Sequence, residues 1–224
     1  MSGLGLAYAL LAALTAARAT GAGRDIDVSL FDMALINTAY QATWYLNEGV
    51  VTGRLPRSAH PALTPCQLYR SRDGWIYIMC NKEKFWPALC EKLGRPEWSA
   101  DARFRLFYDR LQHRDLLTEM LDRELGQRTT VEWLERFAGV VPAAPINDLA
   151  QALENPFVTE HDRLQTLPHP TRGSYRMVAS PVRCAGEEPP ARPAPALGEH
   201  TDALLREIGY DGARIQALRD SKII

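Results

Sequence analysis

The sequence lacks a surplus of charge of either sign. Lysine and arginine number 26 against 27 aspartates and glutamates, so the formal net charge of the 224 residues is −1. Proteins that bind nucleic acid usually carry a basic surplus, and we therefore expect no nucleic acid partner. The length allows one large domain or two small ones, and either can bury a substantial core.

Metal-binding and disulfide patterns are missing as well. The four cysteines (Cys66, Cys80, Cys90 and Cys184) are scattered with no CxxC, and the five histidines are dispersed. This spacing excludes the usual zinc motifs, and we predict no metal site. We expect reduced, mostly buried thiols in a cytoplasmic protein.

Two common catalytic motifs are absent from the chain. It contains no Walker loop and no G-x-S-x-G nucleophile turn, which argues against a P-loop enzyme and a serine hydrolase. Gly21-Ala22-Gly23 lacks the third glycine and the preceding strand of a dinucleotide-binding turn.

Residues 1–17 form an uncharged run of leucines among alanines that ends near Arg18. The spacing predicts a buried or half-buried helix, with Gly21 placed for a left-handed cap. The run is shorter than the ~20 residues that a membrane span requires, so we predict no span. A secretory signal peptide is the alternative, but no lysine or arginine precedes the run.

The next elements alternate between regular structure and loop. Ile26–Phe31 alternates apolar and polar residues, which predicts a short strand, and Asp32 is a candidate cap for a helix over Met33–Leu46. Gly49–His60 has little periodicity and predicts a loop or linker. A unit that opens on a helix, with no strand before it, suggests that part of the fold lies upstream.

The middle of the chain predicts one β-hairpin covered by helices. Cys66–Cys80 has β-branched and aromatic flanks around Asp73-Gly74, which suits a tight turn. Three helical patterns follow, running from an Asn81 cap to Leu93, from about His113 to Leu125, and from Thr129 or Thr130 to Phe137. Their apolar residues recur at i, i+3, i+4 and i+7 and predict a shared core.

The last third of the chain predicts short elements joined by extended segments. They are an extended stretch over Val140–Pro145, a helix from Asn147 or Asp148 to Leu153, strands over Tyr175–Val178 and Pro181–Cys184, an exposed proline-rich crossing over Glu188–Pro195, and closing helices over Thr201–Ile208 and Asp211–Leu218.

The loop over Gly49–His60 carries the best candidate binding residues. The guanidinium groups of Arg54 and Arg57 match a phosphate or carboxylate in two-point hydrogen bonds, although a solvated charge in a linker is an equal alternative. His60 is a candidate ligand contact because binding residues concentrate in loops, with a solvated histidine as its alternative. Asp27 and Asp32 flank the predicted strand and are a weaker acid–base pair, since aspartate strongly favours helix caps.

Eight segments, in order along nearly the whole chain, carry a resemblance to a known family. They are Gly3–Ala17, Thr20–Arg24, Ile26–Asp32, His60-Pro61, Thr64–Tyr69, Asp73–Ile76, Val141–Asp148 and Ala196–Thr201. Together they resemble the middle and end of the family III CoA-transferases, the formyl-CoA and carnitine CoA-transferase group.

The resemblance implies an α/β fold, with an incomplete Rossmann-like large domain and a small α+β domain. Residues 1–60 would end the first section of the large domain and form a linker, 61–160 would form the small domain, and 161–224 would return to the large domain. It also implies an interlocked homodimer.

The implied activity moves coenzyme A between an acyl-CoA thioester and a carboxylic acid through an aspartyl-CoA intermediate. The family's nucleophilic aspartate precedes the helix that begins here at Ser2, and this chain has no Asp or Glu before Asp25. We therefore carry over no catalytic residue and expect the chain alone to be inactive. A coenzyme A thioester would be a substrate, with no permanently bound cofactor.

The family's glycine-rich lid would fall within residues 48–60, where only Gly49 and Gly53 remain. The resulting set of candidate substrate-binding residues is Gly53, Arg54, Arg57 and His60. Two other functions stay open at this point: an acyl-CoA racemase of the same fold, and a non-catalytic dimerisation module.

Overall fold

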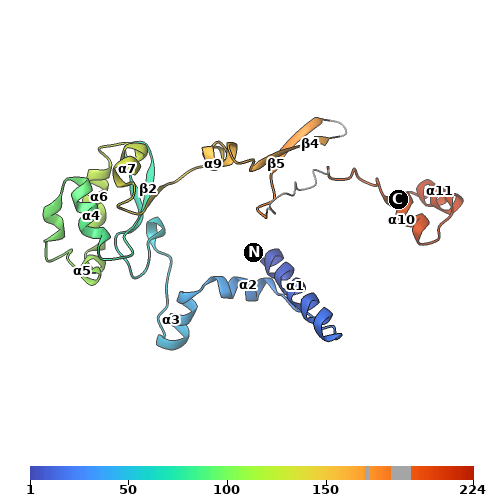
Figure 1. The fold of residues 1–224 in the computed structure, drawn as a ribbon, viewed down its shortest axis with the longest axis horizontal. Coiled ribbons are helices and arrows are strands. Elements are labelled where there is room, and N and C mark those ends of the chain that lie inside the picture. Colours follow the sequence, from blue (N-terminus) through green and yellow to red (C-terminus); the bar gives the residue numbers. More distant parts are fainter. Residues whose placement is uncertain (170–171, 183–192) are drawn as a thin grey trace. The chain divides into compact units, whose positions relative to one another are not determined.

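The computed structural model describes residues 1–169, 172–182 and 193–224 (Figure 1). These residues form two compact units, Met1–Ile146 and Asn147–Ile224. The domain boundaries expected near residues 60 and 160 stay a prediction.

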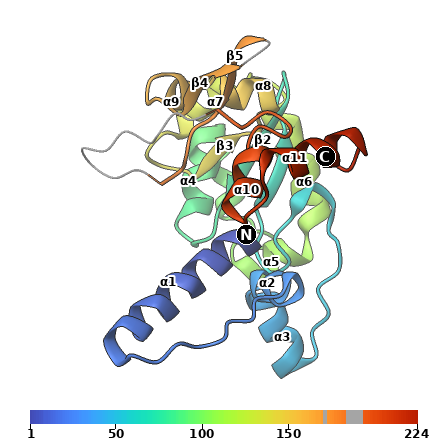
Figure 2. The same ribbon diagram turned by 90° about the vertical axis from the view of Figure 1, so that its right-hand side faces the viewer.

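The first unit opens on the predicted helix, α1 (Ser2–Thr20), which ends at Gly21 with φ 72°. The Gly21 N–H donates to the Ala17 carbonyl, so the left-handed glycine cap is confirmed. Figure 2 shows α1 as a straight helix joined to α2 (Leu30–Asn37) by an extended segment. A β-carbon at Gly5 would lie 2.8 Å from the Met33 side chain, so glycine permits this contact between α1 and α2.

The strand predicted over Ile26–Phe31 is wrong, because residues 22–29 have no regular structure and α2 already begins at Leu30. A strand needs a neighbour for its backbone hydrogen bonds, and no strand in the described ranges pairs with this segment. The cap prediction for Asp32 is also wrong. Ser29 caps α2, and its hydroxyl accepts from the Asp32 N–H at 2.9 Å.

The helix predicted over Met33–Leu46 is broken into α2 and α3 (Tyr40–Glu48). The break falls at Ala39, whose φ of 48° and ψ of −120° interrupt the helical backbone. Gly49 ends α3 with φ 66°, and the expected loop follows, containing one short 3₁₀ turn at Pro56–Ser58.

By length and composition α1 meets the requirements of a membrane span, with 19 residues and a mean hydropathy of 1.3. The length argument made from the sequence therefore does not exclude a span. Core helices of other proteins and signal sequences meet the same requirements.

The predicted hairpin is confirmed as β1 (Cys66–Arg70) and β2 (Trp75–Met79). The strands are antiparallel, with Leu68 opposite Tyr77, and the Ser71 N–H donates to the Gly74 carbonyl across the turn. The extended segment after residue 140 adds β3 (Ala143–Pro145) to the free side of β2. The sheet order is β1-β2-β3.

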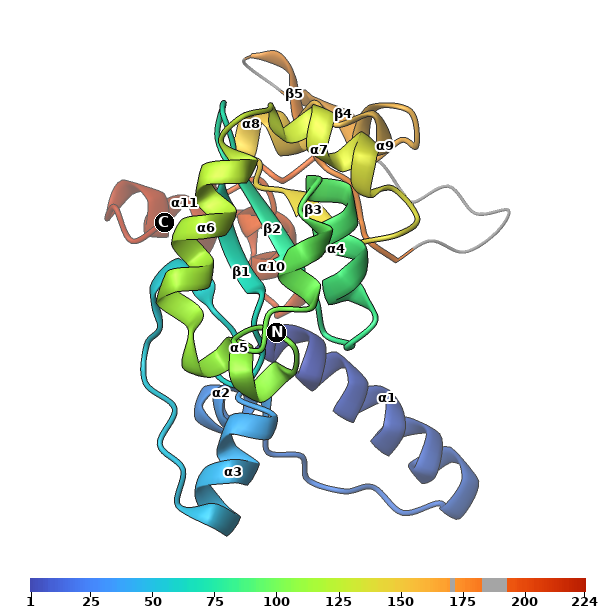
Figure 3. The same cartoon turned by 90° about the vertical axis from the view of Figure 1, so that its left-hand side faces the viewer.

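Helices cover this sheet, as Figure 3 shows, and they are α4 (Phe85–Leu93), α5 (Phe107–Gln112), α6 (Arg114–Leu125) and α7 (Thr130–Phe137). The Thr129 cap of α7 is as predicted. The Asn81 cap is wrong: residues 82–84 first form a turn, in which the Phe85 N–H donates to the Lys82 carbonyl. Sequence reasoning missed α5 and a 3₁₀ turn at Pro96–Ser99.

One apolar core lies between the sheet and these helices. Its fully buried side chains include Tyr69, Ile76, Ile78, Trp86, Leu89, Phe104, Leu117, Leu121, Leu125 and Phe137. The Trp133 indole is also buried and donates to the Leu125 carbonyl at 2.7 Å. The helical and strand periodicities place these residues on the inner faces, except Phe104, which lies in a turn that the sequence analysis did not identify.

The described residues of the second unit form a hairpin and four short helices. Its elements are α8 (Leu149–Leu153), α9 (Pro156–Thr159), β4 (Leu164–His169), β5 (Gly173–Val178), α10 (Thr201–Glu207) and α11 (Gly212–Asp220). The predictions for α8, β5, α10 and α11 are confirmed.

Residues 181 and 182 do not form the strand predicted over Pro181–Cys184, and no described strand pairs with them. Residues 183 and 184 of that prediction lie outside the described ranges. Of the proline-rich segment, residues 193–195 are exposed and irregular, and residues 188–192 lie outside those ranges.

Candidate functional site

The loop after α3 borders a cavity of about 440 Å³ in the first unit. Its lining is mostly apolar and includes Trp44, Val51, Leu55 and Pro61, with Glu48 as a carboxylate. Gly53, one of the four candidate binding residues, also lines this cavity. The Thr52 hydroxyl is buried beside it and has no hydrogen-bond partner among the residues that the structure describes. The cavity therefore offers apolar surface with two polar groups.

Arg54 lies next to Gly53 on the exposed part of the loop. Within the described part of the chain its guanidinium makes no ion pair or hydrogen bond. It is therefore the candidate residue whose charge is most available to an anionic ligand.

Arg57 is engaged within the protein. Its Nη1 lies 2.7 Å from the Asp122 carboxylate, and its guanidinium lies 5.5 Å from the centre of the Trp75 ring. Asp122 also accepts from the backbone N–H of Arg70 at 2.9 Å. Arg57 has φ 58°, a backbone conformation that costs free energy outside glycine, so these contacts hold a strained residue in place.

Both ring nitrogens of His60 are also engaged. Nδ1 lies 3.1 Å from the backbone nitrogen of Ala62, and Nε2 lies 3.1 Å from the Tyr40 hydroxyl. The His60 and Tyr40 rings stack with their centres 5.6 Å apart. Burial lowers the pKa of His60, and the nearby Arg114 guanidinium, which donates to the His60 carbonyl, lowers it further.

Gly53, Arg54, Arg57 and His60 thus lie in one loop but not around one point. The structure places Gly53 at the cavity, leaves Arg54 in solvent, and gives Arg57 and His60 protein partners. Asp27 and Asp32 form no acid–base pair: Asp27 is exposed, and Asp32 accepts from Ser29. The role of the four loop residues in binding stays a prediction.

The three described cysteines, Cys66, Cys80 and Cys90, are free and buried. Burial raises the pKa of the Cys90 thiol to about 12 and that of Cys80 further still. A thiol held in its protonated form is a poor nucleophile and a poor metal ligand. Cys80 and Cys90 therefore belong to the core and not to a reactive site.

Sequence reasoning missed the buried cation Arg110. Its side chain is fully buried, donates to the Thr64 and Phe104 carbonyls, and pairs with Glu83 at 2.6 Å. Nothing in the helical pattern distinguishes it from a surface arginine, because its partners come from distant segments. Its full set of internal partners makes it a structural residue.

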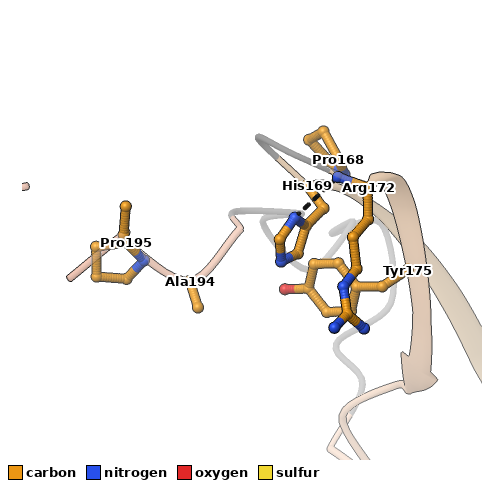
Figure 4. A pocket seen from close by; sticks show the side chains of 7 residues that line it. Pro168, His169, Arg172, Tyr175, Ala194 and Pro195 are labelled. Carbon is orange, nitrogen blue, oxygen red and sulfur yellow. Dashed lines mark hydrogen bonds between the residues drawn. The ribbon is translucent and has the colours of Figure 1, made fainter.

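The second unit has a cavity of its own, of about 530 Å³ (Figure 4). Pro168, His169, Arg172 and Tyr175 of the β4–β5 hairpin line it together with Pro195. The Arg172 backbone N–H donates to His169 Nδ1, and the His169 ring meets the Tyr175 ring edge to face at 5.8 Å. No sequence pattern indicated this cavity, because the segment of β4 was not predicted as the strand that pairs with β5.

The first unit thus combines a helix-covered hairpin with the helices α1, α2 and α3 and with the candidate binding loop. The model of CoA-transferase family III matches residues 1–201. The chain belongs to CoA-transferase family III.

Curated relatives agree with this assignment. The chain is 31% identical over 209 residues to the acetyl-CoA:oxalate CoA-transferase of Acetobacter aceti, covering 92% of this chain and 52% of the relative. It is 29% identical to the succinyl-CoA:glutarate CoA-transferase of Mus musculus, covering 96% of this chain and 50% of the relative. The chain thus spans about half the length of these relatives.

Solved structures show the same fold. A crystal structure of an M. tuberculosis protein matches with a TM-score of 0.76 at 27% identity, covering 90% of this chain and 53% of the other. A CAIB/BAIF family protein from Brucella suis matches with a TM-score of 0.73 at 29% identity, covering 92% of this chain and 54% of the Brucella protein. The expected α/β fold of the family III CoA-transferases is confirmed.

Proposed function

We propose that this chain is part of an enzyme that moves coenzyme A from an acyl-CoA thioester to a carboxylic acid. The observation that carries the proposal is the family match over residues 1–201. The relatives named above act between acyl-CoA donors and dicarboxylic acids, which supports this class of substrates. A coenzyme A thioester is then a substrate and not a resident cofactor.

The proposed chemistry uses an aspartate supplied from outside residues 1–224. Its carboxylate attacks the thioester carbonyl, forms a mixed anhydride and releases the CoA thiolate. The thiolate attacks the aspartyl carbonyl of the anhydride, which gives the aspartyl-CoA thioester and the free donor acid. The acceptor carboxylate then displaces the thiolate to form a second anhydride. Attack of the thiolate on the acceptor carbonyl yields the new acyl-CoA and restores the aspartate.

The loop residues would contribute to substrate binding in this scheme. Gly53 lines the cavity and the Arg54 guanidinium is unpaired within the described ranges, so both are available to a carboxylate or phosphate group. Arg57 and His60 would reach a substrate only by giving up the protein partners described above.

The proposal includes an interlocked homodimer and a cytoplasmic location. The helices α1, α2 and α3 have no buried residues, which supports an interlocked homodimer in which a second chain covers them. The free buried thiols support a reducing compartment such as the cytoplasm.

The test is an exchange assay by liquid chromatography, with acetyl-CoA or succinyl-CoA as donor and oxalate or glutarate as acceptor. The 224-residue chain alone is expected to show no exchange. A form extended upstream in its own reading frame to include an aspartate before Ser2 is expected to exchange CoA, and Arg54→Ala is expected to weaken it. Turnover by the 224-residue chain, with hydroxylamine-trappable label on Asp27 or Asp32, would contradict the placement of the nucleophile. Failure of the extended form with every donor would contradict the proposed activity.

A further inference from the structure

The segment from Tyr40 to His60 is closed by a contact between its two ends. Tyr40 is the first residue of α3, and His60 lies in the loop between α3 and β1, after Gly53 and Arg54. The Tyr40 hydroxyl lies 3.1 Å from His60 Nε2, and the two rings stack. The contact therefore joins residues that are twenty positions apart in the sequence.

The hydrogen bonds determine the protonation state of the imidazole. A backbone nitrogen only donates, so the Ala62 N–H requires His60 Nδ1 to be an acceptor. An imidazole with an unprotonated Nδ1 is neutral and carries its proton on Nε2. Nε2–H then donates to the Tyr40 oxygen. The closed form thus needs the neutral Nε2–H tautomer.

Protonation makes this arrangement impossible. In the imidazolium both ring nitrogens carry hydrogen, so Nδ1–H would face the Ala62 N–H across 3.1 Å. The ring must turn away, and turning breaks the stack and the bond to Tyr40. The charged and titratable groups around the ring are the Tyr40 phenol, the Arg114 guanidinium of α6 and, near Tyr40, the Tyr77 phenol of β2. The Arg114 guanidinium opposes an added positive charge on the ring, and no carboxylate is among these groups to offset it.

The backbone of the same segment is under strain. Ala39 precedes it with φ 48°, and Arg57 and Ser58 lie within it with φ 58° and 51°. Residues in such conformations persist only where surrounding contacts hold them. When the contact between the two ends is lost, these three residues are free to relax, and the loop that carries Gly53 and Arg54 changes conformation.

We propose that the Tyr40–His60 contact is a latch that holds the segment 40–60 closed while His60 is neutral and releases it when His60 takes up a proton. The latch sets the conformation of the candidate binding loop. It does not depend on the proposed CoA transfer, and the test below measures no activity.

The test is a pH titration of the whole chain by NMR between pH 7.5 and 4.5. The Ala62 amide and the Tyr40 ring signals are expected to titrate with the same midpoint as the His60 ring, below the usual value of about 6.5 for histidine. One pH unit below that midpoint the open form outnumbers the closed form by about ten to one. A His60 ring that titrates while the Ala62 amide and Tyr40 signals stay constant would overturn the latch.

Two variants separate the latch from general acid effects. His60→Asn offers an amide oxygen in place of Nδ1 and has no titrating group, so the pH response of Ala62 is expected to disappear. His113→Asn, whose ring nitrogen contacts the Asp109 carbonyl on α5, is the matched control and is expected to keep the response. An unchanged Ala62 response in His60→Asn would refute the proposal. If His60→Asn does not fold, the comparison of midpoints in the unaltered chain still decides.

Discussion

The helices of residues 1–48 and the helices around the hairpin differ in what they bury. α1 has 19 residues and none is buried, and the same holds for every residue of α2 and α3. α4 has nine residues, of which Trp86, Leu89, Cys90 and Leu93 are buried. Helices of both sets end on a left-handed glycine, at Gly21 and Gly49 in the first set and at Gly94 in the second. The comparison teaches that local sequence makes a helix, whereas burial requires a partner.

The distribution of apolar residues explains the difference. In α7 the buried Trp133 and Phe137 lie on one face, opposite charged residues such as Glu132 and Arg136. In α1 leucines and alanines surround the helix, and Leu4, Leu11 and Leu14 are exposed on it. A helix that is apolar all round is typical of a buried position in a larger protein. α1 therefore has the composition of a core helix without the core around it.

The largest expected effect compares the same substitution in the two regions. Phe137→Ala empties a site that is 1% exposed and is expected to lower the free energy of unfolding by about 3–5 kcal/mol. Phe31→Ala removes a ring that is 71% exposed on α2 and is expected to change the free energy of unfolding by less than about 0.5 kcal/mol. Urea unfolding followed by far-UV circular dichroism measures both. Equal losses would show that α2 is packed as firmly as α7.

A smaller effect is expected at the helix caps. The Thr129 hydroxyl accepts from the Glu132 N–H and caps α7, so Thr129→Ala is expected to cost about 1 kcal/mol of global stability. Ser29 caps α2 by the same bond to Asp32, but Ser29→Ala is expected to leave global unfolding unchanged and only to speed amide exchange within α2. A loss of global stability in Ser29→Ala would mean that α2 unfolds together with the core.

The smallest effect concerns acid stability. Asp73 accepts from the Thr130 N–H and hydroxyl and from the Ser71 hydroxyl, and these bonds lower its pKa. Because the folded pKa lies below the unfolded one, this stabilisation is complete above the unfolded pKa and is lost as the pH falls through the folded pKa. Asp73→Asn is expected to reduce the stability difference between pH 7 and pH 3. Asp25→Asn, on an exposed segment, is the control and is expected to leave the difference unchanged.

Periodicity and turn chemistry predicted most of the elements around the core. Asp73-Gly74 located the hairpin, and the apolar spacing located α4, α6 and α7, because these patterns reflect which face a residue presents to its neighbours. The same reasoning failed at Ile26–Phe31. Its alternation suits a strand, but a strand forms only where a neighbouring strand supplies partners for its backbone hydrogen bonds.

The candidate loop was recognised from the sequence, whereas its contacts were not. Arginine and histidine among glycines and prolines marked residues 49–60 as irregular and potentially functional. Asp122 and Tyr40, the partners of Arg57 and His60, lie 65 and 20 positions away. A spacing of that kind leaves no periodic signal, so only the folded chain could reveal the ion pair and the ring contact.

The sequence by itself determined the glycine ends of α1 and α4, the β1–β2 hairpin, most side chains of the core and the family to which the chain belongs. Caps, turns and periodic apolar positions act within a few residues, and the sequence displays them directly. Only the tertiary structure decided that Arg110 is buried, that Arg57 and His60 have protein partners, and that no residue of α1 is buried by the described parts of the chain. Each of these features depends on contacts between segments that are far apart in the sequence, and such contacts form only when the chain packs.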